Sequence, residues 1–241
     1  MLLGGSGTLG SCIIKSKFFK NIDNPSKKKL NILNKKKIEN YLLKNNFEII
    51  IHCAALARVK ECESKKKLAK KINIDGTSNI VKAIQRFKKI SNKDIYLVFI
   101  STDAVYSSDK GNNKETDKLA PYNFYGKTKV SGELKVKKIK KFMIVRTRFF
   151  NRNKIPFKFS ANNIYTSGIE VNLLVRYIRQ LITKKFIGVI NVGGKKISDF
   201  NKYKKFKKNL KPCDKSFILN QLNFKIATDS SLNISKLKKI V

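Results

Sequence analysis

Apolar runs and helix-period patterns alternate along this chain of 241 residues. The segment 96–100 reads Tyr-Leu-Val-Phe-Ile, a continuous apolar run of strand length that is rich in β-branched and aromatic residues. Such a run is typical of a strand buried on both faces of a parallel sheet. Other apolar runs predict further strands at 1–3, 19–22, 30–33, 47–52 and 188–194.

Helical patterns lie between these runs. Asn34 can act as the N-cap of a helix over 35–45. The segments 73–84 and 171–182 also carry apolar residues at helical spacing, and a helix is expected after Pro121. Strands that alternate with helices predict an α/β fold with a Rossmann-like, doubly wound parallel sheet.

A glycine-rich turn joins the first predicted strand to a helical segment. Gly4, Gly7 and Gly10 form a Gly-x-x-Gly-x-x-Gly spacing. Glycines in this position allow a tight turn and let backbone N–H groups approach a pyrophosphate at a helix N-terminus. The turn therefore predicts a dinucleotide site. Only three residues precede it, so the first strand is expected to be short.

Two features bear on the cofactor. Asp23 follows the predicted strand 19–22, where a carboxylate would bind the adenosine ribose of NAD, but Ser26 and 27–29 would equally suit the extra phosphate of NADP. Both cofactors therefore stay open. The small residues at 53–57, after a predicted strand, would let a flat ring approach the backbone.

Polar side chains with the chemistry of proton transfer follow the strand at 96–100. Ser101, Thr102 and Asp103 come at its carboxyl end, where open α/β sheets bind ligands. Tyr125 and Lys129 are spaced i,i+4, so on a helix both side chains leave the same face. An ammonium near a phenol lowers the phenol pKa, and such a group can exchange a proton with a substrate oxygen.

Lysine dominates the charge balance. The chain has 54 Lys and Arg against 16 Asp and Glu, a formal charge of +38, and seven of the 54 are arginine. Bidentate recognition of bases or phosphates favours arginine, and the lysines are scattered over nearly every predicted helix and loop. Abundant lysine, asparagine and isoleucine together also fit codon bias in an AT-rich genome. We therefore expect no specific nucleic-acid partner, only non-specific binding of polyanions at low salt.

Cysteine and histidine usage suggests neither a metal site nor a disulfide framework. Cys12, Cys53, Cys62 and Cys213 lie far apart without a Cys-x-x-Cys pair, and His52 is the one histidine. His52 is interpreted as a strand-end residue with a local hydrogen bond. A reducing cytoplasm is the expected location, because no apolar run has the pattern of a signal peptide or the length of a membrane span.

Several motifs occur together in an order that is more specific than any one of them. The chain resembles the extended short-chain dehydrogenase/reductases of the NAD-dependent epimerase/dehydratase superfamily, and within them the dTDP-4-dehydrorhamnose reductase branch. The Ser-Thr-Asp-x-Val-Tyr form of 101–106 points to that branch and away from sugar-nucleotide epimerases. The motifs that carry the resemblance, in about the first 150 residues, are 4–10, 52–55, 73–79, 101–106, 115–117, 121–129, 132–133 and 145–147.

The resemblance implies two regions and a cofactor. Residues 1–150 would form an NAD(P)-binding Rossmann domain, and residues 151–241 a small C-terminal substrate-binding lobe that is partly interleaved with the sheet and closed by 229–237. The segment 151–163 is short and basic compared with the loop that shapes the sugar pocket in this family. The cofactor, NADP or NAD, would be bound by Gly4, Gly7, Thr8, Leu9, Gly10, Asn31, Ile32, Cys53, Ala54, Ala55, Ser101, Tyr125 and Lys129.

The activity implied is reduction of a nucleotide-linked 4-keto-deoxysugar, in nucleotide-sugar and polysaccharide biosynthesis. Tyr125 would donate the proton, Lys129 would contact the nicotinamide ribose, Thr102 would bind the substrate oxygen, and Asp103 would orient the site. The partner would be a small-molecule nucleotide-sugar, with no membrane and with a homodimer as the expected assembly. Two alternatives are an epimerase or dehydratase of the same fold and a non-catalytic NAD(P)-binding regulatory protein.

Overall fold

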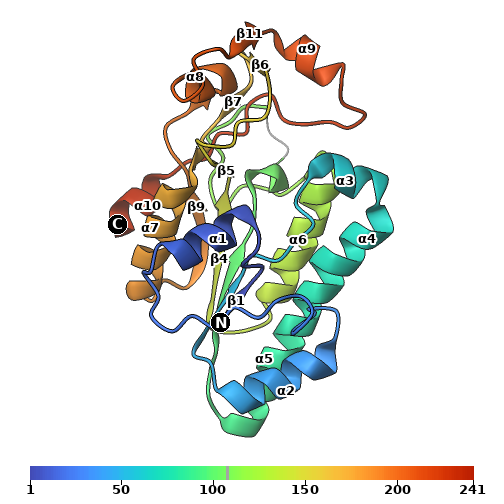
Figure 1. Cartoon of the computed structure of the whole chain (residues 1–241), viewed down its shortest axis with the longest axis vertical. Coiled ribbons are helices and arrows are strands. Elements are labelled where there is room, and N and C mark those ends of the chain that lie inside the picture. Colours follow the sequence, from blue (N-terminus) through green and yellow to red (C-terminus); the bar gives the residue numbers. More distant parts are fainter. Residues whose placement is uncertain (107–108) are drawn as a thin grey trace.

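A five-stranded parallel sheet forms the centre of the protein. The computed structural model describes residues 1–106 and 109–241, and the strand order of its main sheet is β1-β2-β3-β4-β9 (Figure 1). The apolar middles of the strands are buried, as expected for a sheet that is covered on both faces. The strands are β1 (Leu2–Leu3), β2 (Ile49–His52), β3 (Tyr96–Ile100), β4 (Phe142–Thr147) and β9 (Gly188–Val192).

Three helices cover one face of this sheet: α2 (Lys35–Asn45), α5 (Thr77–Ser91) and α6 (Phe124–Val136), on the right in Figure 1. The side chain of Asn34 accepts a hydrogen bond from the Lys37 N–H, which confirms the predicted cap of α2. The predicted helix at 73–84 is confirmed as a π-helical turn that continues into α5. The π-helical turn spans Lys71–Gly76. It is preceded along the chain by α3 (Val59–Ser64) and α4 (Lys66–Lys70).

The other face is covered by α1 (Thr8–Lys15), α7 (Val171–Thr183) and α10 (Ser235–Ile240), which lie on the left in Figure 1. The apolar stripe of α7 packs against β4 and β9, so this helix and β9 bring the second half of the chain onto the sheet. Helices on both faces of a parallel sheet confirm the predicted α/β fold class.

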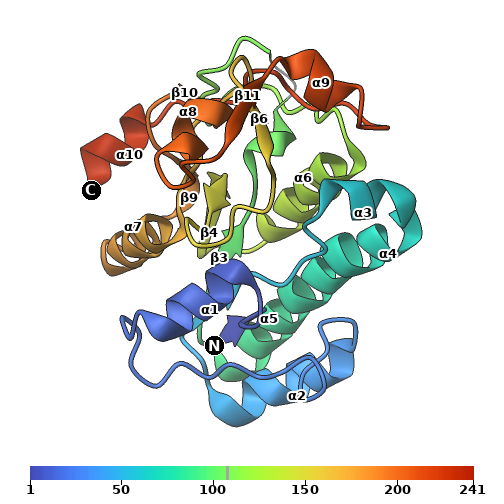
Figure 2. The same ribbon diagram turned by 45° about the horizontal axis from the view of Figure 1, so that its top comes forward.

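Short elements gather at the carboxyl ends of the central strands, at the top of Figures 1 and 2. Most of them come from residues beyond 150, as Figure 2 shows by colour. These elements are the 3₁₀ turn Asp103–Val105, β5 (Phe149–Phe150), β6 (Phe159–Ala161), β7 (Tyr165–Thr166), β8 (Ile169–Glu170), β10 (Ile197–Ser198), α8 (Asp199–Lys204), β11 (Lys211–Cys213) and α9 (Lys215–Leu219).

The strands predicted at 19–22 and 30–33 are wrong. Asn21 has a φ of 54°, which interrupts an extended backbone. This segment contacts β1 through one backbone hydrogen bond, from the Leu2 N–H to the Asp23 carbonyl, and forms no ladder with it among the described residues. The segment 30–33 forms a turn, in which the Asn31 carbonyl accepts a hydrogen bond from the Asn34 N–H. The sheet therefore ends at β1, which pairs with β2 alone. Strand β2 is also shorter than predicted, since it begins at Ile49.

Candidate active site

The glycine turn lies at the carboxyl end of β1 and is packed against the loop after β2. Gly4 has a φ of 89°, and a Cβ atom there would lie 2.5 Å from the Ala54 nitrogen. A Cβ atom at Gly10 would lie 2.3 Å from the Gly4 carbonyl oxygen. At Gly7, in contrast, the nearest atom to a Cβ would be 3.4 Å away. Gly4 and Gly10 are thus required by the packing of the turn, whereas Gly7 borders open space.

Helix α1 begins directly after this turn without a side-chain cap. Its N-cap is Gly7, and no side chain accepts a hydrogen bond there. The backbone N–H groups of the first helical turn are therefore available to an anion, and the helix dipole favours negative charge at that end. The backbone geometry fits the pyrophosphate of a dinucleotide.

A cleft of about 560 Å³ opens beside the glycine turn. Seven residues predicted to bind the cofactor line it: Gly4, Gly7, Asn31, Ile32, Cys53, Ala54 and Ala55. Three others do not line this cleft. Leu9 is buried in the core, Gly10 packs on the turn, and Thr8 is exposed at the start of the helix. The remaining three, Ser101, Tyr125 and Lys129, lie at the end of β3 and on α6.

The far wall of the cleft is formed by the turn around Ser26. Asn24, Ser26 and Lys27 line it, while the Asp23 carboxylate accepts a hydrogen bond from the Tyr41 hydroxyl at 3.0 Å. Asp23 therefore does not take the position expected for a carboxylate that binds the ribose of NAD. The hydroxyl of Ser26 and the ammonium of Lys27 are groups that bind phosphate.

The side chain of Asn73 connects the loop after β2, which borders the cleft, to helix α6. Its side chain accepts a hydrogen bond from the Leu56 N–H at 2.8 Å and donates to the Leu56 carbonyl at 3.0 Å. It also donates to the Thr128 hydroxyl at 2.9 Å. This buried amide fixes the loop after β2 against the helix that carries Tyr125 and Lys129. The sequence motif contained Asn73, but its spacing alone gave no reason to assign it this role.

Tyr125 and Lys129 lie one turn apart on α6, as predicted. The helix begins after Asn123, whose side chain accepts a hydrogen bond from the Gly126 N–H at 3.0 Å. Tyr125 is half-buried, and Lys129 is buried with its ammonium 3.9 Å from the centroid of the Phe99 ring. Burial lowers the pKa of Lys129 to about 8, although Glu133 and the thiols of Cys53 and Cys62 oppose that change.

The predicted decrease in the pKa of Tyr125 is wrong. Burial raises its pKa above the ordinary value of 10.0, and the charges of Asp103 and Cys62 act in the same direction. A hydrogen bond with Thr102 and the charge of Arg148 oppose the increase. Tyr125 is therefore protonated at neutral pH, which is the form that a proton donor requires.

Asp103 is held by side chains from three parts of the chain. Its Oδ1 accepts a hydrogen bond from the Thr102 hydroxyl at 3.1 Å, and its Oδ2 accepts one from the Ser230 hydroxyl at 2.8 Å. Arg148 Nε lies 2.7 Å from the same Oδ2. Thr102 and Asp103 are buried, and Arg148 is partly exposed. Sequence reasoning identified Thr102 and Asp103 but missed Arg148, and it placed Ser230 only in the closing segment 229–237, without a role at the site.

Ser101 belongs to a buried network behind the site. Its hydroxyl donates to Glu133 Oε1 at 2.6 Å, and Arg146 Nη2 lies 2.7 Å from Glu133 Oε2. Arg146 also donates to the Tyr106 hydroxyl at 2.8 Å. The side chain of Ser101 is thus engaged with α6 and β4 and does not line the cleft. This network fixes the end of β3 against α6 and therefore Thr102 relative to Tyr125.

His52 lies at the end of β2, as predicted, but its hydrogen-bond partner is on α5 and not local in the sequence. Its Nε2 lies 3.1 Å from the Thr77 hydroxyl, and burial, followed by the charge of Lys129, lowers its pKa to about 3. Within residues 1–106 and 109–241, no group of three His, Cys, Asp or Glu side chains could hold a metal ion, and all four cysteines are free thiols. None of the helices in this part of the chain is both long and apolar enough to cross a membrane.

A parallel sheet with a glycine turn, a cleft at its carboxyl edge and a Tyr-Lys pair beside that edge defines a Rossmann-like nucleotide-binding protein. The chain belongs to the family described as RmlD substrate binding domain, whose model matches residues 1–161. The resemblance to the dTDP-4-dehydrorhamnose reductase branch is thereby confirmed.

Solved structures with similar folds include two reductases. A dTDP-4-dehydrorhamnose reductase from Bacillus anthracis in complex with NADP is 26% identical with a TM-score of 0.86, covering 99% of this chain and 91% of that chain. A dTDP-4-dehydrorhamnose reductase from Clostridium acetobutylicum is 25% identical with a TM-score of 0.84, covering 96% and 88%. The similarity therefore extends over nearly the whole chain.

Curated relatives match over shorter segments. Methionine adenosyltransferase 2 subunit beta from Pongo abelii is 29% identical over 109 residues, which are 45% of this chain and 31% of that protein. A dTDP-4-dehydrorhamnose reductase from Mycolicibacterium smegmatis is 34% identical over 90 residues, which are 36% of this chain and 26% of that protein. The matched segments thus span about a third or less of these relatives.

Proposed function

We propose that the protein is an NAD(P)H-dependent reductase of the short-chain dehydrogenase/reductase type that acts on a nucleotide-linked 4-keto-deoxysugar. The observation that carries this proposal is the common face of Tyr125 and Lys129 on α6, next to Thr102 and Asp103 and joined by Asn73 to the floor of the glycine cleft. The similarity to the reductases from Bacillus anthracis and Clostridium acetobutylicum supports it.

The cofactor would bind along the glycine turn and the cleft. Backbone N–H groups after Gly7 would bind the pyrophosphate, and Cys53 to Ala55 would form the wall beside the ribose. When bound, the reduced cofactor supplies a hydride. The buried ammonium of Lys129 would donate hydrogen bonds to the nicotinamide ribose at the inner end of the site.

Tyr125 is the proposed proton donor. As negative charge develops on the substrate oxygen, its hydroxyl would transfer a proton to that oxygen. The Thr102 hydroxyl donates its one proton to Asp103 in this structure, and it would have to turn from Asp103 to donate to the substrate oxygen. Asp103 would thus hold Thr102 in place until substrate binds. Asp103 is thus proposed to act through Thr102.

The turn at Ser26 supports NADPH as the preferred reductant. Ser26 and Lys27 line the outer wall of the cleft, whereas Asp23 is bound to Tyr41. A 2′-phosphate would gain charge-assisted hydrogen bonds from Lys27, and NADH lacks that group.

Residues 151–241 are proposed to form the substrate lobe over the carboxyl ends of the strands, as an addition to the domain of residues 1–150. Ser230 supports this assignment, because its hydroxyl, near the C-terminal end of the chain, donates a hydrogen bond to Asp103. Four free thiols support a reducing cytoplasm as the location. A homodimer stays a prediction.

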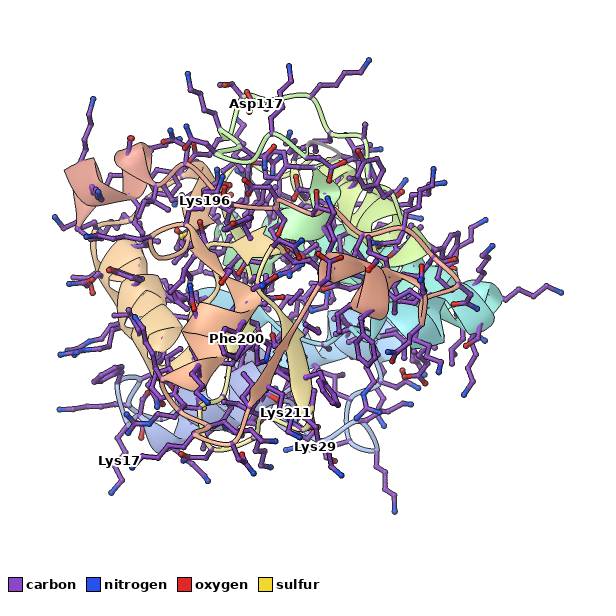
Figure 3. All side chains as sticks on the ribbon, turned by 90° about the horizontal axis from the view of Figure 1, so that it is seen from above. Lys17, Lys29, Asp117, Lys196, Phe200 and Lys211 are labelled. Atoms are coloured by element: carbon purple, nitrogen blue, oxygen red, sulfur yellow. The ribbon has the colours of Figure 1, made fainter. Side chains whose placement is uncertain are left out.

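A small-molecule nucleotide-sugar is the proposed partner, without a specific nucleic acid or a membrane. The labelled Lys17 and Lys196 lie at separate places in Figure 3, while Lys29 and Lys211, from distant segments of the chain, are labelled close together in that view. Scattered lysines of this kind do not form the continuous basic stripe that is typical of nucleic-acid recognition.

Replacement of Tyr125 by phenylalanine tests the proposal. With NADPH and dTDP-4-dehydrorhamnose, Tyr125→Phe should lose about 10²- to 10⁴-fold in kcat, because proton donation is removed. The matched control is Tyr177→Phe, which removes a phenol from α7, outside the site. Wild-type oxidation of NADPH by purified, folded Tyr125→Phe would refute the assignment.

The two alternatives predict different results in the same assay. An epimerase would convert the sugar without net consumption of NADPH. A non-catalytic NAD(P)-binding regulatory protein of the same fold would bind NADPH but show no turnover.

A further inference from the structure

We propose that Arg148 is a positioning residue of this site, which neutralises Asp103 and thereby allows Tyr125 to give up its proton beside a buried carboxylate. The inference rests on the proposed reductase function. It assigns to Arg148 an electrostatic role that is separate from hydride transfer and from substrate contact.

The geometry of Asp103 requires a positive partner. The carboxylate is 2% exposed, and both of its oxygens accept hydrogen bonds. Arg148 forms its one ion pair among the described residues, at 2.7 Å from Nε to Oδ2. Removal of Arg148 would leave this buried carboxylate without its ion-pair partner, which is a costly arrangement.

Tyr125 experiences both members of this pair. The charge of Asp103 raises the pKa of Tyr125 and that of Arg148 lowers it. The other titratable groups that face the phenol are the Cys62 thiol, which raises its pKa, and Lys129, one turn further along α6. Without Arg148, the tyrosinate that proton donation leaves would lie beside an uncompensated carboxylate.

Arg148 is itself fixed from the side of the C-terminal lobe. Its carbonyl accepts a hydrogen bond from Ile169 N–H at 3.0 Å. Burial opposes its charge, but Asp103, Asp199 and Tyr203 together hold its pKa above the ordinary value. Lys202, a like charge nearby, is already paired with Asp199 at 2.6 Å. The guanidinium therefore stays charged and available to Asp103.

Arg148 takes no part in the bonds that break and form in the proposed reduction. The Tyr125 O–H bond breaks and its proton goes to the carbonyl oxygen of the substrate, while the hydride forms the new C–H bond. The ketone is reduced to an alcohol and NADPH is oxidised to NADP⁺. Arg148 transfers neither proton nor electron, so its effect must appear through the charge of Asp103.

A double-mutant cycle tests this role. We would measure kcat and KM with NADPH and dTDP-4-dehydrorhamnose for wild type, Arg148→Gln, Arg148→Lys, Asp103→Asn and the double variant Asp103→Asn/Arg148→Gln. Removal of Arg148 should lower kcat by roughly 10²-fold with little change in KM, as for the loss of an electrostatic group that acts in the transition state. Arg148→Lys should recover about tenfold of that loss, because it keeps the charge without the guanidinium fork.

The double variant gives the discriminating result. Since Asp103→Asn removes the charge that Arg148 neutralises, the double variant should turn over about tenfold faster than Arg148→Gln alone. Arg176→Gln, which removes an exposed arginine from α7, is the matched control. NADPH affinity and Tm of each variant report whether it is folded, and Arg148→Lys serves the test if Arg148→Gln does not fold.

Other outcomes would overturn the inference. These are an unchanged kcat in Arg148→Gln, a rise in KM alone, which would indicate direct substrate contact, and a double variant no faster than Arg148→Gln. The proposed function fails in a distinguishable way. If wild type itself shows no NADPH consumption with this substrate, the reductase assignment is refuted and the role of Arg148 is refuted with it.

Discussion

The ammonium of Lys129 lies 3.9 Å from the centroid of the Phe99 ring, at the inner end of the proposed cofactor site. Phe99 is buried in β3, so the charge rests on an aromatic face. Among the described residues Lys129 forms no ion pair, and burial lowers its pKa to about 8. A buried charge of this kind lowers the stability of the folded protein, and it is available to bind a ligand.

Lys129→Met should therefore stabilise the protein and weaken its function. At pH 7 the folded protein holds a charge there that burial disfavours, so its removal should raise Tm by about 2–4 °C, corresponding to roughly 1 kcal/mol. NADPH affinity and turnover should fall, because the ammonium is lost. Calorimetry and fluorescence titration measure the two effects. Lys127→Met, at an exposed position of α6, should change neither, and a lower Tm for Lys129→Met would contradict this account.

The effect of Lys129 should depend on pH. The pKa of Lys129 is lowered from 10.5 to about 8 in the folded protein. At a pH between these two values the amine is protonated in the unfolded chain and largely neutral in the folded one. The Tm difference between Lys129→Met and wild type should be greatest below pH 8 and disappear as the pH rises to 10.5. Over the same range kcat/KM for NADPH should fall in wild type. A difference in Tm that is independent of pH would show that Lys129 is not the responsible group.

Gly7 and Gly10 should respond differently to the same substitution. Gly10→Ala places a methyl group 2.3 Å from the Gly4 carbonyl oxygen and should destabilise the turn by about 1–3 kcal/mol, as overpacking does. Gly7→Ala meets no atom closer than 3.4 Å and should leave Tm unchanged. It should still weaken NADPH binding about tenfold, because a pyrophosphate must approach the backbone there. Equal NADPH affinity in wild type and Gly7→Ala would place the cofactor elsewhere.

Lys27→Ala should reduce discrimination between the two nicotinamide cofactors. Lys27 lines the outer wall of the cleft, where it is proposed to bind the 2′-phosphate of NADPH. Loss of this charge-assisted contact, typically about 1.5–3 kcal/mol, should raise Kd for NADPH by roughly tenfold or more and leave Kd for NADH unchanged. Lys36→Ala, on the exposed side of α2, provides the control for general charge. A parallel loss of affinity for both cofactors would refute the assignment.

The sequence predicted the elements in which local pattern and final structure agree. The run at 96–100 became the buried central strand β3, the run predicted at 188–194 became the edge strand β9 (Gly188–Val192), and the Asn34 cap and the Tyr125-Lys129 face formed as expected. In each case the local pattern of apolar residues, caps or helical spacing is enough to define the element, although the strands then pair with distant neighbours. The strands at 19–22 and 30–33 failed because apolar residues there pack beneath turns without a neighbouring strand to pair with.

The candidate site was predictable only in part. The glycine turn and the Tyr-Lys pair have a fixed spacing, but the side chains that hold Asp103 come from residue 148 and residue 230. Spacing also suggested that Lys129 would lower the pKa of Tyr125, whereas burial and Asp103 raise it. Burial depends on the tertiary packing of α6 and is not visible in a local pattern.

The bond between Ser230 and Asp103 joins residues that are 127 positions apart in the chain. Closing a loop of this length costs more chain entropy than the shorter connections between β2, β3 and β4, so we expect Ser230 to reach Asp103 after these strands have paired. The sheet and its glycine turn can thus be complete while Asp103 still lacks one of its donors. On this expectation the glycine turn is formed during folding before the last of the contacts that hold Asp103.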